Sequence, residues 1–133
     1  MSCKSALYAA LQTPTAVAID GVIPLGSLIR RYGCDISLNG NAVNLSGAGY
    51  YEVDASITVA PTAAGTVTAT LVKDGVAIPG ATASAAAAAG APTVLSFPAL
   101  VRQACCAAGS ALTLVLSGAA ATVNNVALRV QRI

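Results

Sequence analysis

The chain has 133 residues, a length typical of one compact domain, and we expect residues 1–133 to form a single domain. It contains no histidine, which excludes every catalytic or metal site that needs a histidine from the same chain. A net charge of +2, from seven basic and five acidic residues, is too small for a nucleic-acid-binding surface. Hydrophobic residues make up 56% of the chain, which excludes intrinsic disorder.

The mean hydropathy of +0.73 raises the question of a membrane span. Two long stretches carry no charge, residues 75–101 and 103–128. Pro79, Pro92 and Pro98 interrupt the first, and polar residues alternate with apolar ones in the second. A spanning helix needs about 20 predominantly apolar residues. We therefore predict no membrane span, and the first 20 residues lack the continuous apolar segment of a secretory signal.

Charged residues are scarce, at 9% of the chain against about a quarter in average proteins. Obligate protein interfaces are apolar and depleted in charge. The composition therefore indicates that copies of the chain cover part of one another's surface.

Along the first half of the chain, apolar residues recur with a period of two. A turn at Asn39-Gly40 separates two short alternating segments, residues 36–38 and 43–45. Residues 50–59 form the clearest alternation, with apolar side chains at the odd positions, which predicts a half-buried strand. Residues 66–71 repeat it, and Asp74-Gly75 predicts a hairpin turn.

The second half continues in the same way. Pro79-Gly80 predicts another turn, and we interpret the alanine run 85–89 as a small-residue strand or loop, with a short helix as the alternative. In residues 111–117 the leucines share one face. Asn124-Asn125 predicts a turn before a final strand over Val126–Ile133. Short alternating strands with frequent turns predict an all-β sandwich or barrel.

The order of four segments resembles a known superfamily. The segments GAGYYEVDASITV, TVTATLVKDGVAIPGA, ALTLVLSG and NNVALRVQRI resemble the trimeric jelly roll of the complement-globular-head and tumour-necrosis-factor superfamily, in particular its bacterial and bacteriophage branch. That branch usually has a Gly-Tyr-Tyr strand, an "NG(V)xIPG" hairpin and a hydrophobic last strand. Here Asp74 replaces the commoner asparagine of the hairpin. GVIPLG, RRYGCDISLNG and FPALVRQACC also resemble the branch, so the likeness runs from about Ser5 to Ile133.

The resemblance implies an antiparallel β-sandwich (a jelly roll) and a tight homotrimer with the last strand near the threefold axis. In that strand Val126, Leu128 and Val130 alternate with residues 127, 129, 131 and 133. On this basis we predict a trimer interface that contains Tyr51, Val126, Leu128, Val130 and Ile133.

Four cysteines leave several uses open. Cys3, Cys34, Cys105 and Cys106 form no CxxC pair, and no histidine completes a zinc site. The first interpretation is that the four cysteines are small, buried hydrophobic residues. A disulfide between Cys34 and one of the adjacent pair is the second, and metal or redox chemistry is the third.

The five acidic residues give no candidate for catalysis or metal binding. Glu52 and Asp54 share a strand face about 7 Å apart, a spacing that suits paired carboxylates, but a solvated face is the favoured interpretation. Calcium needs several converging oxygen ligands, and the acids Asp20, Asp35 and Asp74 are scattered. We predict no catalytic residue, no cofactor and no metal.

The remaining candidates are basic and aromatic residues and one sequence motif. The arginines at 30, 31, 102, 129 and 132 serve solubility and intersubunit pairing, or form a basic surface for a capsid or glycan. Asn44-Leu45-Ser46 matches a glycosylation acceptor, which matters only in an exported protein. Tyr32, Tyr50 and Tyr51 serve core or interface packing, or stack on a sugar.

Together with these patterns, the resemblance implies a non-enzymatic, homotrimeric structural protein of a bacteriophage virion. We expect a head decoration or a fibre-head module, assembled in the host cytoplasm, with other virion proteins such as the major capsid protein as partners. The sequence shows no collagen-like stalk, which favours a free-standing virion protein. The alternative is an adhesin tip that binds a receptor or host-surface glycan, on a phage tail fibre or on a bacterial or spore surface.

Overall fold

The structure is a computed structural model that describes residues 5–33, 35–103 and 109–133. These residues form eleven strands and no helix, so the described part of the chain offers no helix long and apolar enough to cross a membrane. The strands are β1 (Ala6–Leu11), β2 (Thr15–Val17), β3 (Ser27–Tyr32), β4 (Ile36–Asn39), β5 (Ala42–Leu45), β6 (Gly49–Pro61), β7 (Gly65–Lys73), β8 (Val76–Ala87), β9 (Thr93–Gln103), β10 (Ser110–Ser117) and β11 (Ala121–Arg132).

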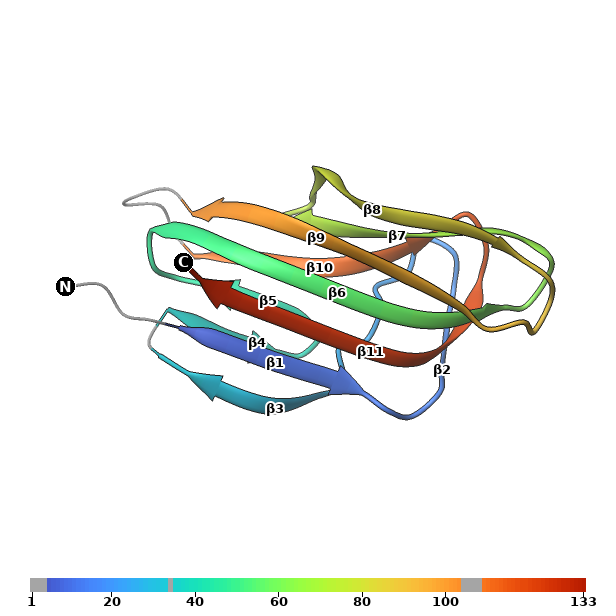
Figure 1. Cartoon of the computed structure of the whole chain (residues 1–133), viewed down its shortest axis with the longest axis horizontal. Coiled ribbons are helices and arrows are strands. Elements are labelled where there is room, and N and C mark those ends of the chain that lie inside the picture. Colours follow the sequence, from blue (N-terminus) through green and yellow to red (C-terminus); the bar gives the residue numbers. More distant parts are fainter. Residues whose placement is uncertain (1–4, 34, 104–108) are drawn as a thin grey trace.

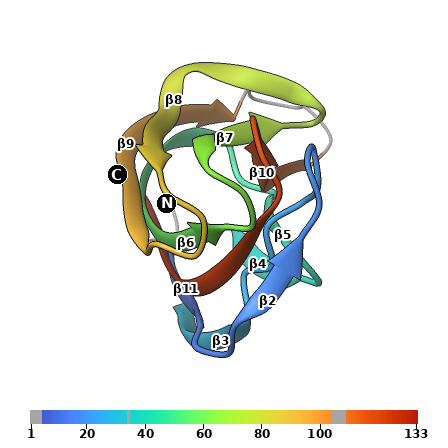
Figure 2. The same cartoon turned by 90° about the vertical axis from the view of Figure 1, so that its right-hand side faces the viewer.

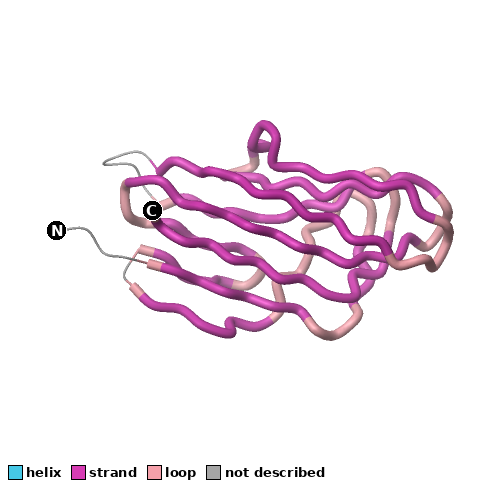
Figure 3. The backbone as a smooth tube through the Cα atoms, in the orientation of Figure 1, coloured by secondary structure: helices cyan, strands magenta, loops and turns pink. Residues whose placement is uncertain are grey.

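The strands build two antiparallel sheets that pack face to face (Figures 1 and 2). The first sheet has the order β3-β1-β11-β6-β9, and β2 pairs with the start of β11. The second sheet has the order β4-β5-β10-β7-β8. The long strands run along the long axis of the molecule, and loops gather at its ends (Figure 3). This confirms the predicted all-β jelly-roll sandwich.

The core lies between the two sheets and follows from the alternation in the sequence. In β6 the odd residues from Tyr51 to Val59 are buried, and the even residues from Glu52 to Thr58 are half-buried on the opposite face. In β10 the leucines at 112, 114 and 116 are buried against them. Because a strand side chain points to alternate faces, each strand contributes one face to the core.

Two hairpins form at the predicted turns. Gly40-Asn41, one residue later than the predicted Asn39-Gly40, joins β4 to β5, and Asp74-Gly75 joins β7 to β8. The φ angles are +62° at Gly40, and 51° and 84° at Asp74 and Gly75. In the Asp74-Gly75 turn, positive φ at both central residues suits the right-handed twist of paired strands, and Asp-Gly adopts it at low cost.

Two other predicted turns are wrong. Pro79-Gly80 lies inside β8, and Asn124-Asn125 lies inside β11. At both places the strand continues through a register shift, between Thr70 and Val72 on the partner of β8 and between Val123 and Asn125 of β11. In β11 a bulge absorbs one extra residue, Asn124. In β8 four residues, 78–81, lie opposite Leu71 alone before pairing resumes, so the turn-forming residues end neither strand.

The alanine run and the last strand follow the sequence more closely. β8 extends to Ala87, which agrees with a small-residue strand and excludes the short helix. The last strand, β11, is central in its sheet because it pairs with β1 on one side and β6 on the other. Its last residues therefore lie between Ala6 and Glu52 rather than at a free edge.

Candidate self-association surface

The outer face of the first sheet is organised in rows of side chains that run across the strands. Its strand registers place Tyr32, Ala6, Gln131, Glu52 and Leu100 in one row. The next row contains Arg30, Tyr8, Arg129, Asp54 and Pro98, and the third contains Ser27, Ala10, Ala127, Ser56 and Ser96. The face is thus bulky in its first two rows and made of small side chains in the third.

Large apolar and aromatic side chains are exposed on this outer face. They come from β1, β3, β6 and β9 and from the end of the chain: Tyr8, Tyr32, Tyr50, Val94, Leu100 and Ile133. Leu100 is 58% exposed and Val94 is 61% exposed. Exposed apolar side chains of this kind, here interspersed with the charged residues of the first two rows, mark a candidate surface for protein interaction.

The outer face of the second sheet is different, since hydroxyl groups line it along β7 and β8. Thr68 donates a hydrogen bond to Ser84 (3.1 Å between the oxygens), and Thr70 and Thr82 are bonded at 3.2 Å. Thr82 also donates to the carbonyl of Ala69. Hydroxyl groups form hydrogen bonds with water although they carry no charge. This part of the second sheet is therefore suited to contact with solvent, and the exposed apolar side chains of the first sheet are suited to contact with protein.

A group of three charged side chains lies near the centre of the first sheet. The Arg129 guanidinium donates to Glu52 Oε1 at 3.3 Å and to Asp54 Oδ2. All three side chains are about half exposed. We call this group the 52–54–129 triad, and with one positive and two negative charges it carries a net charge of −1. The predicted carboxylate pair therefore binds an arginine.

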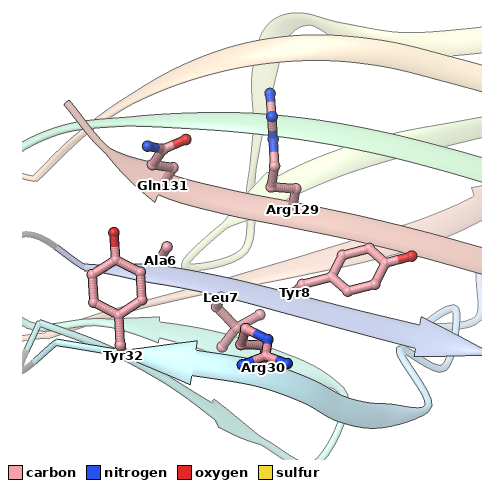
Figure 4. A pocket seen from close by; sticks show the side chains of 7 residues that line it. All are labelled: Ala6, Leu7, Tyr8, Arg30, Tyr32, Arg129 and Gln131. Carbon is pink, nitrogen blue, oxygen red and sulfur yellow. The ribbon is translucent and has the colours of Figure 1, made fainter.

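A pocket of about 150 Å³ opens beside the triad, between β1, β3 and β11 (Figure 4). It is lined by Ala6, Leu7, Tyr8, Arg30, Tyr32, Arg129 and Gln131. The rings of Tyr8 and Tyr32 flank it, and Ala6 lies near Tyr32 (Figure 4). A neighbouring hollow of about 180 Å³ forms over Ser56 and Ala127, because the third row has no large side chain.

A second charged cluster stabilises the end of β11. Arg132 forms an ion pair with Asp35, and both side chains are less than one-fifth exposed. Arg132 also donates to the carbonyl of Ala48, and the Tyr51 hydroxyl donates to the carbonyl of Gly47 at 2.7 Å. Burial, and then the negative charge of Asp35, raises the pKa of Tyr51 above its usual value of 10.0.

The predicted interface residues fall into two groups. Tyr51, Val126, Leu128 and Val130 are at most 1% exposed, and their side chains pack on the second sheet of the same chain. Ile133 is 68% exposed. A second copy that approaches the first sheet from outside meets the alternate residues of β11, including Arg129 and Gln131. The alternation in the sequence was correct, but it does not say which face meets a partner.

The other candidate residues are distributed over the surface or lie outside the described part of the chain. Cys3, Cys34, Cys105 and Cys106 all lie outside the described residues. Asn44 is half-buried in β5, paired between β4 and β10 rather than in a loop.

The other candidate arginines, Arg30, Arg31 and Arg102, lie near the edges of the first sheet. Arg30 is exposed on β3, and Arg31 donates to the carbonyl of Ile36 at 2.6 Å. Arg102 is exposed on β9, and its carbonyl accepts a hydrogen bond from Lys73. The acids do not converge: among the described residues no group of three or more histidine, cysteine or acidic side chains is placed to hold a metal ion.

Sequence reasoning missed Tyr8, Pro98 and Leu100 as surface candidates. Tyr8 alternates with Leu7 and Ala9 in β1, a signal that the sequence contains in the segment ALYAAL. Pro98 and Leu100 lie in FPALVRQ of β9, where Phe97 and Val101 are buried.

Comparison of the whole structure with solved structures identifies the fold. Murine APRIL at pH 8.0 has a TM-score of 0.75 and 14% sequence identity, over 98% of this chain and 99% of that chain. The globular domain of the zebrafish complement 1qA protein has a TM-score of 0.68 and 8% identity, over 96% of both chains. The vertex protein P5 of phage PRD1 has a TM-score of 0.63 and 12% identity, over 97% of this chain and 96% of that chain.

The chain has the tumour-necrosis-factor-like, complement-globular-head jelly-roll fold. The sequence itself matches no family model, and no curated protein matches it. The likeness to solved structures is therefore a likeness of fold alone. That fold is the one that the resemblance of the sequence segments predicted.

Proposed function

We propose that the protein is a non-enzymatic structural component of a bacteriophage virion that folds as one domain and assembles as a homotrimer through the outer face of its first sheet. The observation that carries the proposal is the difference between the two outer faces. One exposes Tyr8, Val94 and Leu100, and the other carries a row of hydrogen-bonded hydroxyl groups along β7 and β8. Exposed apolar side chains on this first face, on a chain with 9% charged residues, favour contact with further copies.

The likeness to the vertex protein of phage PRD1 supports a virion role. A head decoration or fibre-head module, assembled in the host cytoplasm and attached to the major capsid protein or another virion protein, fits a compact sandwich. Closed cyclic symmetry is the usual arrangement of identical subunits, and three copies follow from the superfamily resemblance.

Light scattering of the purified protein tests the assembly. A mass three times the 13.0 kDa of the chain supports it, and a stable monomer contradicts it. The virion role is tested with phage capsids that have been prepared without this protein. They are incubated with the tagged protein and then sedimented. Co-sedimentation supports a head decoration, and binding to tail fibres alone supports a fibre-head module.

The second candidate function is that of an adhesin tip on a tail fibre or on a bacterial or spore surface. The pocket between Tyr8 and Tyr32 favours it, because aromatic rings stack on sugars. A glycan array distinguishes the two functions: saturable binding that is lost in Tyr32→Ala supports the adhesin.

A further inference from the structure

We propose that the free edge of β3 binds an extended, acidic segment of a partner protein, which adds to the first sheet as a further strand. β3 is the terminal strand of that sheet, and among the described strands it pairs with β1 alone. In two views of the molecule no described strand lies beyond it (Figures 1 and 2). A terminal strand presents a row of unpaired N–H and C=O groups, which is the template for strand addition.

The other three edges of the two described sheets are less suited to strand addition. β9 ends the first sheet and β8 ends the second, and each contains a proline, Pro98 and Pro79. Proline has no N–H to donate to an added strand. β4 has four residues and its first, Ile36, is buried. In β3, by contrast, all six residues are exposed and none is proline.

The shape of β3 limits the added segment to a short one. In the register with β1, pairing passes from Leu28 to Arg30, so Ile29 forms a bulge. A bulge bends the edge, which disfavours pairing with a long flat strand. Leu28 and Ile29 are 44% and 51% exposed, so the edge also offers apolar side chains to a partner.

A hollow beside the bulge gives the added segment a place for one side chain. Its volume is about 210 Å³, and residues from the end of β1 and the start of β3 line it, including Gln12, Ser27 and Ile29. In strand addition the main-chain hydrogen bonds supply affinity, and pockets for side chains supply specificity. The edge of β3 provides both.

The charge of the edge selects an acidic segment. Arg30 and Arg31 are both exposed, and in the described part of the chain no acidic side chain lies within ion-pair distance of either. Adjacent strand residues point to opposite faces, so an added strand meets one arginine on each face. Arg31 donates through Nε to the carbonyl of Ile36 at 2.6 Å, and its two terminal nitrogens can bind a carboxylate.

Fluorescence polarisation with two labelled peptides tests the charge selection in the full chain. Both peptides alternate valine with a charged residue, which is glutamate in one and lysine in the other. The wild type should bind the glutamate peptide, and the lysine peptide about tenfold more weakly. Arg30→Glu combined with Arg31→Glu should reverse this preference. Lys73→Glu combined with Arg102→Glu is the matched control, since it makes the same change in net charge on β7 and β9 and should leave the preference unchanged.

Amide hydrogen exchange tests the backbone pairing. The glutamate peptide should slow exchange in residues 27–32, because an added strand accepts hydrogen bonds from the free N–H groups of β3. A glutamate peptide that is N-methylated at every residue has the same side chains but no N–H groups, and it should not bind.

Each outcome supports or overturns the proposal. A reversed preference together with protection of residues 27–32 supports it, and binding of the lysine peptide by the double variant cannot result from unfolding. No binding of either peptide to the wild type, or equal losses in both double variants, overturns it. Binding without protection, or binding of the N-methylated peptide, overturns strand addition.

The inference goes beyond the proposed function and fails separately from it, because every chain carries its own β3 edge. A monomer by light scattering contradicts the proposed trimer and leaves the peptide test valid. Protection of residues 27–32 that rises with protein concentration in the absence of peptide would assign the edge to a second copy and overturn the acidic partner.

Discussion

Arg132 and Asp35 are 97 residues apart in the sequence and form an ion pair that is less than one-fifth exposed. It connects the end of the central strand β11 to the segment before β4. Because a mostly buried charge is costly without its partner, Arg132→Gln should lower the free energy of unfolding by about 2–4 kcal/mol. Urea denaturation measures the change. Arg129→Gln is the matched control, and its half-exposed ion pairs should contribute at most about 1 kcal/mol. Equal losses in both variants would contradict the importance of burial.

The sequence predicts the sandwich well because the alternation reports directly on burial. In β6 each apolar residue from Tyr51 to Val59 is buried, as its position in the alternation indicates. Turn signals are less decisive. Asn124-Asn125 lies inside a strand because the residues on both sides of Asn124 pair with β6, and this pairing outweighs the local preference for a turn.

The candidate surface was harder to predict, for a physical reason. Val126, Leu128 and Val130 are the larger apolar residues of the last strand, and the core of the chain's own sandwich uses them. The opposite face looks polar in sequence because it holds Arg129 and Gln131. Its apolar character comes from Tyr8 and Leu100, which belong to strands distant in sequence, and only the sheet order brings them together.

The buried phenol of Tyr51 predicts a stability change in alkali. Its pKa is raised in the folded state, so the folded chain retains the proton to a higher pH than the unfolded chain does. The stabilisation is therefore complete below pH 10.0 and is lost as the pH rises above it. Comparison of wild type with Tyr51→Phe at pH 8 and pH 11 isolates the effect. The variant should lose about 1 kcal/mol at pH 8 through the missing hydrogen bond to Gly47, and the difference should narrow in alkali. A constant difference would contradict the shift.

The carboxylate of Asp74 predicts a change at the acid end. It accepts a hydrogen bond from the backbone N–H of Ala111 at 2.9 Å, and this bond, followed by one from Ser110, lowers the pKa of Asp74 below 3.8. A lowered pKa means that the stabilisation is present above pH 3.8 and is lost as the pH falls through the folded value. Asp74→Asn should therefore show a smaller loss of thermal stability between pH 5 and pH 2 than the wild type. Identical acid profiles would exclude this role of Asp74.

The apolar outer face predicts that one charge at Leu100 prevents assembly without unfolding the chain. Leu100→Asp places a carboxylate where the proposed interface excludes water, so association should weaken more than tenfold. Val76→Asp is the matched control, because Val76 is 69% exposed at the hairpin of the second sheet. Light scattering should show a monomer for the first variant and a trimer for the second, with the same far-ultraviolet spectrum. Dissociation of both would point to a general effect of charge.

The position of β11 predicts that the end of the chain is essential for folding. Residues 129–131 pair with β1 on one side and β6 on the other, and Val130 is fully buried between Leu7 and Val53. Burial of Val130 alone contributes about 1.5–3 kcal/mol. Deleting residues 129–133 also removes the Arg132 ion pair and leaves the facing edges of β1 and β6 without hydrogen-bond partners. Domains of this size are stable by about 5–15 kcal/mol, so the truncated chain should be neither folded nor trimeric.

Removing only Ile133, which is 68% exposed, should lower the free energy of unfolding by less than about 1 kcal/mol. Circular dichroism and light scattering of both truncations measure this difference, and a five-residue truncation that stays soluble, trimeric and equally heat-resistant would show that the end of β11 is dispensable.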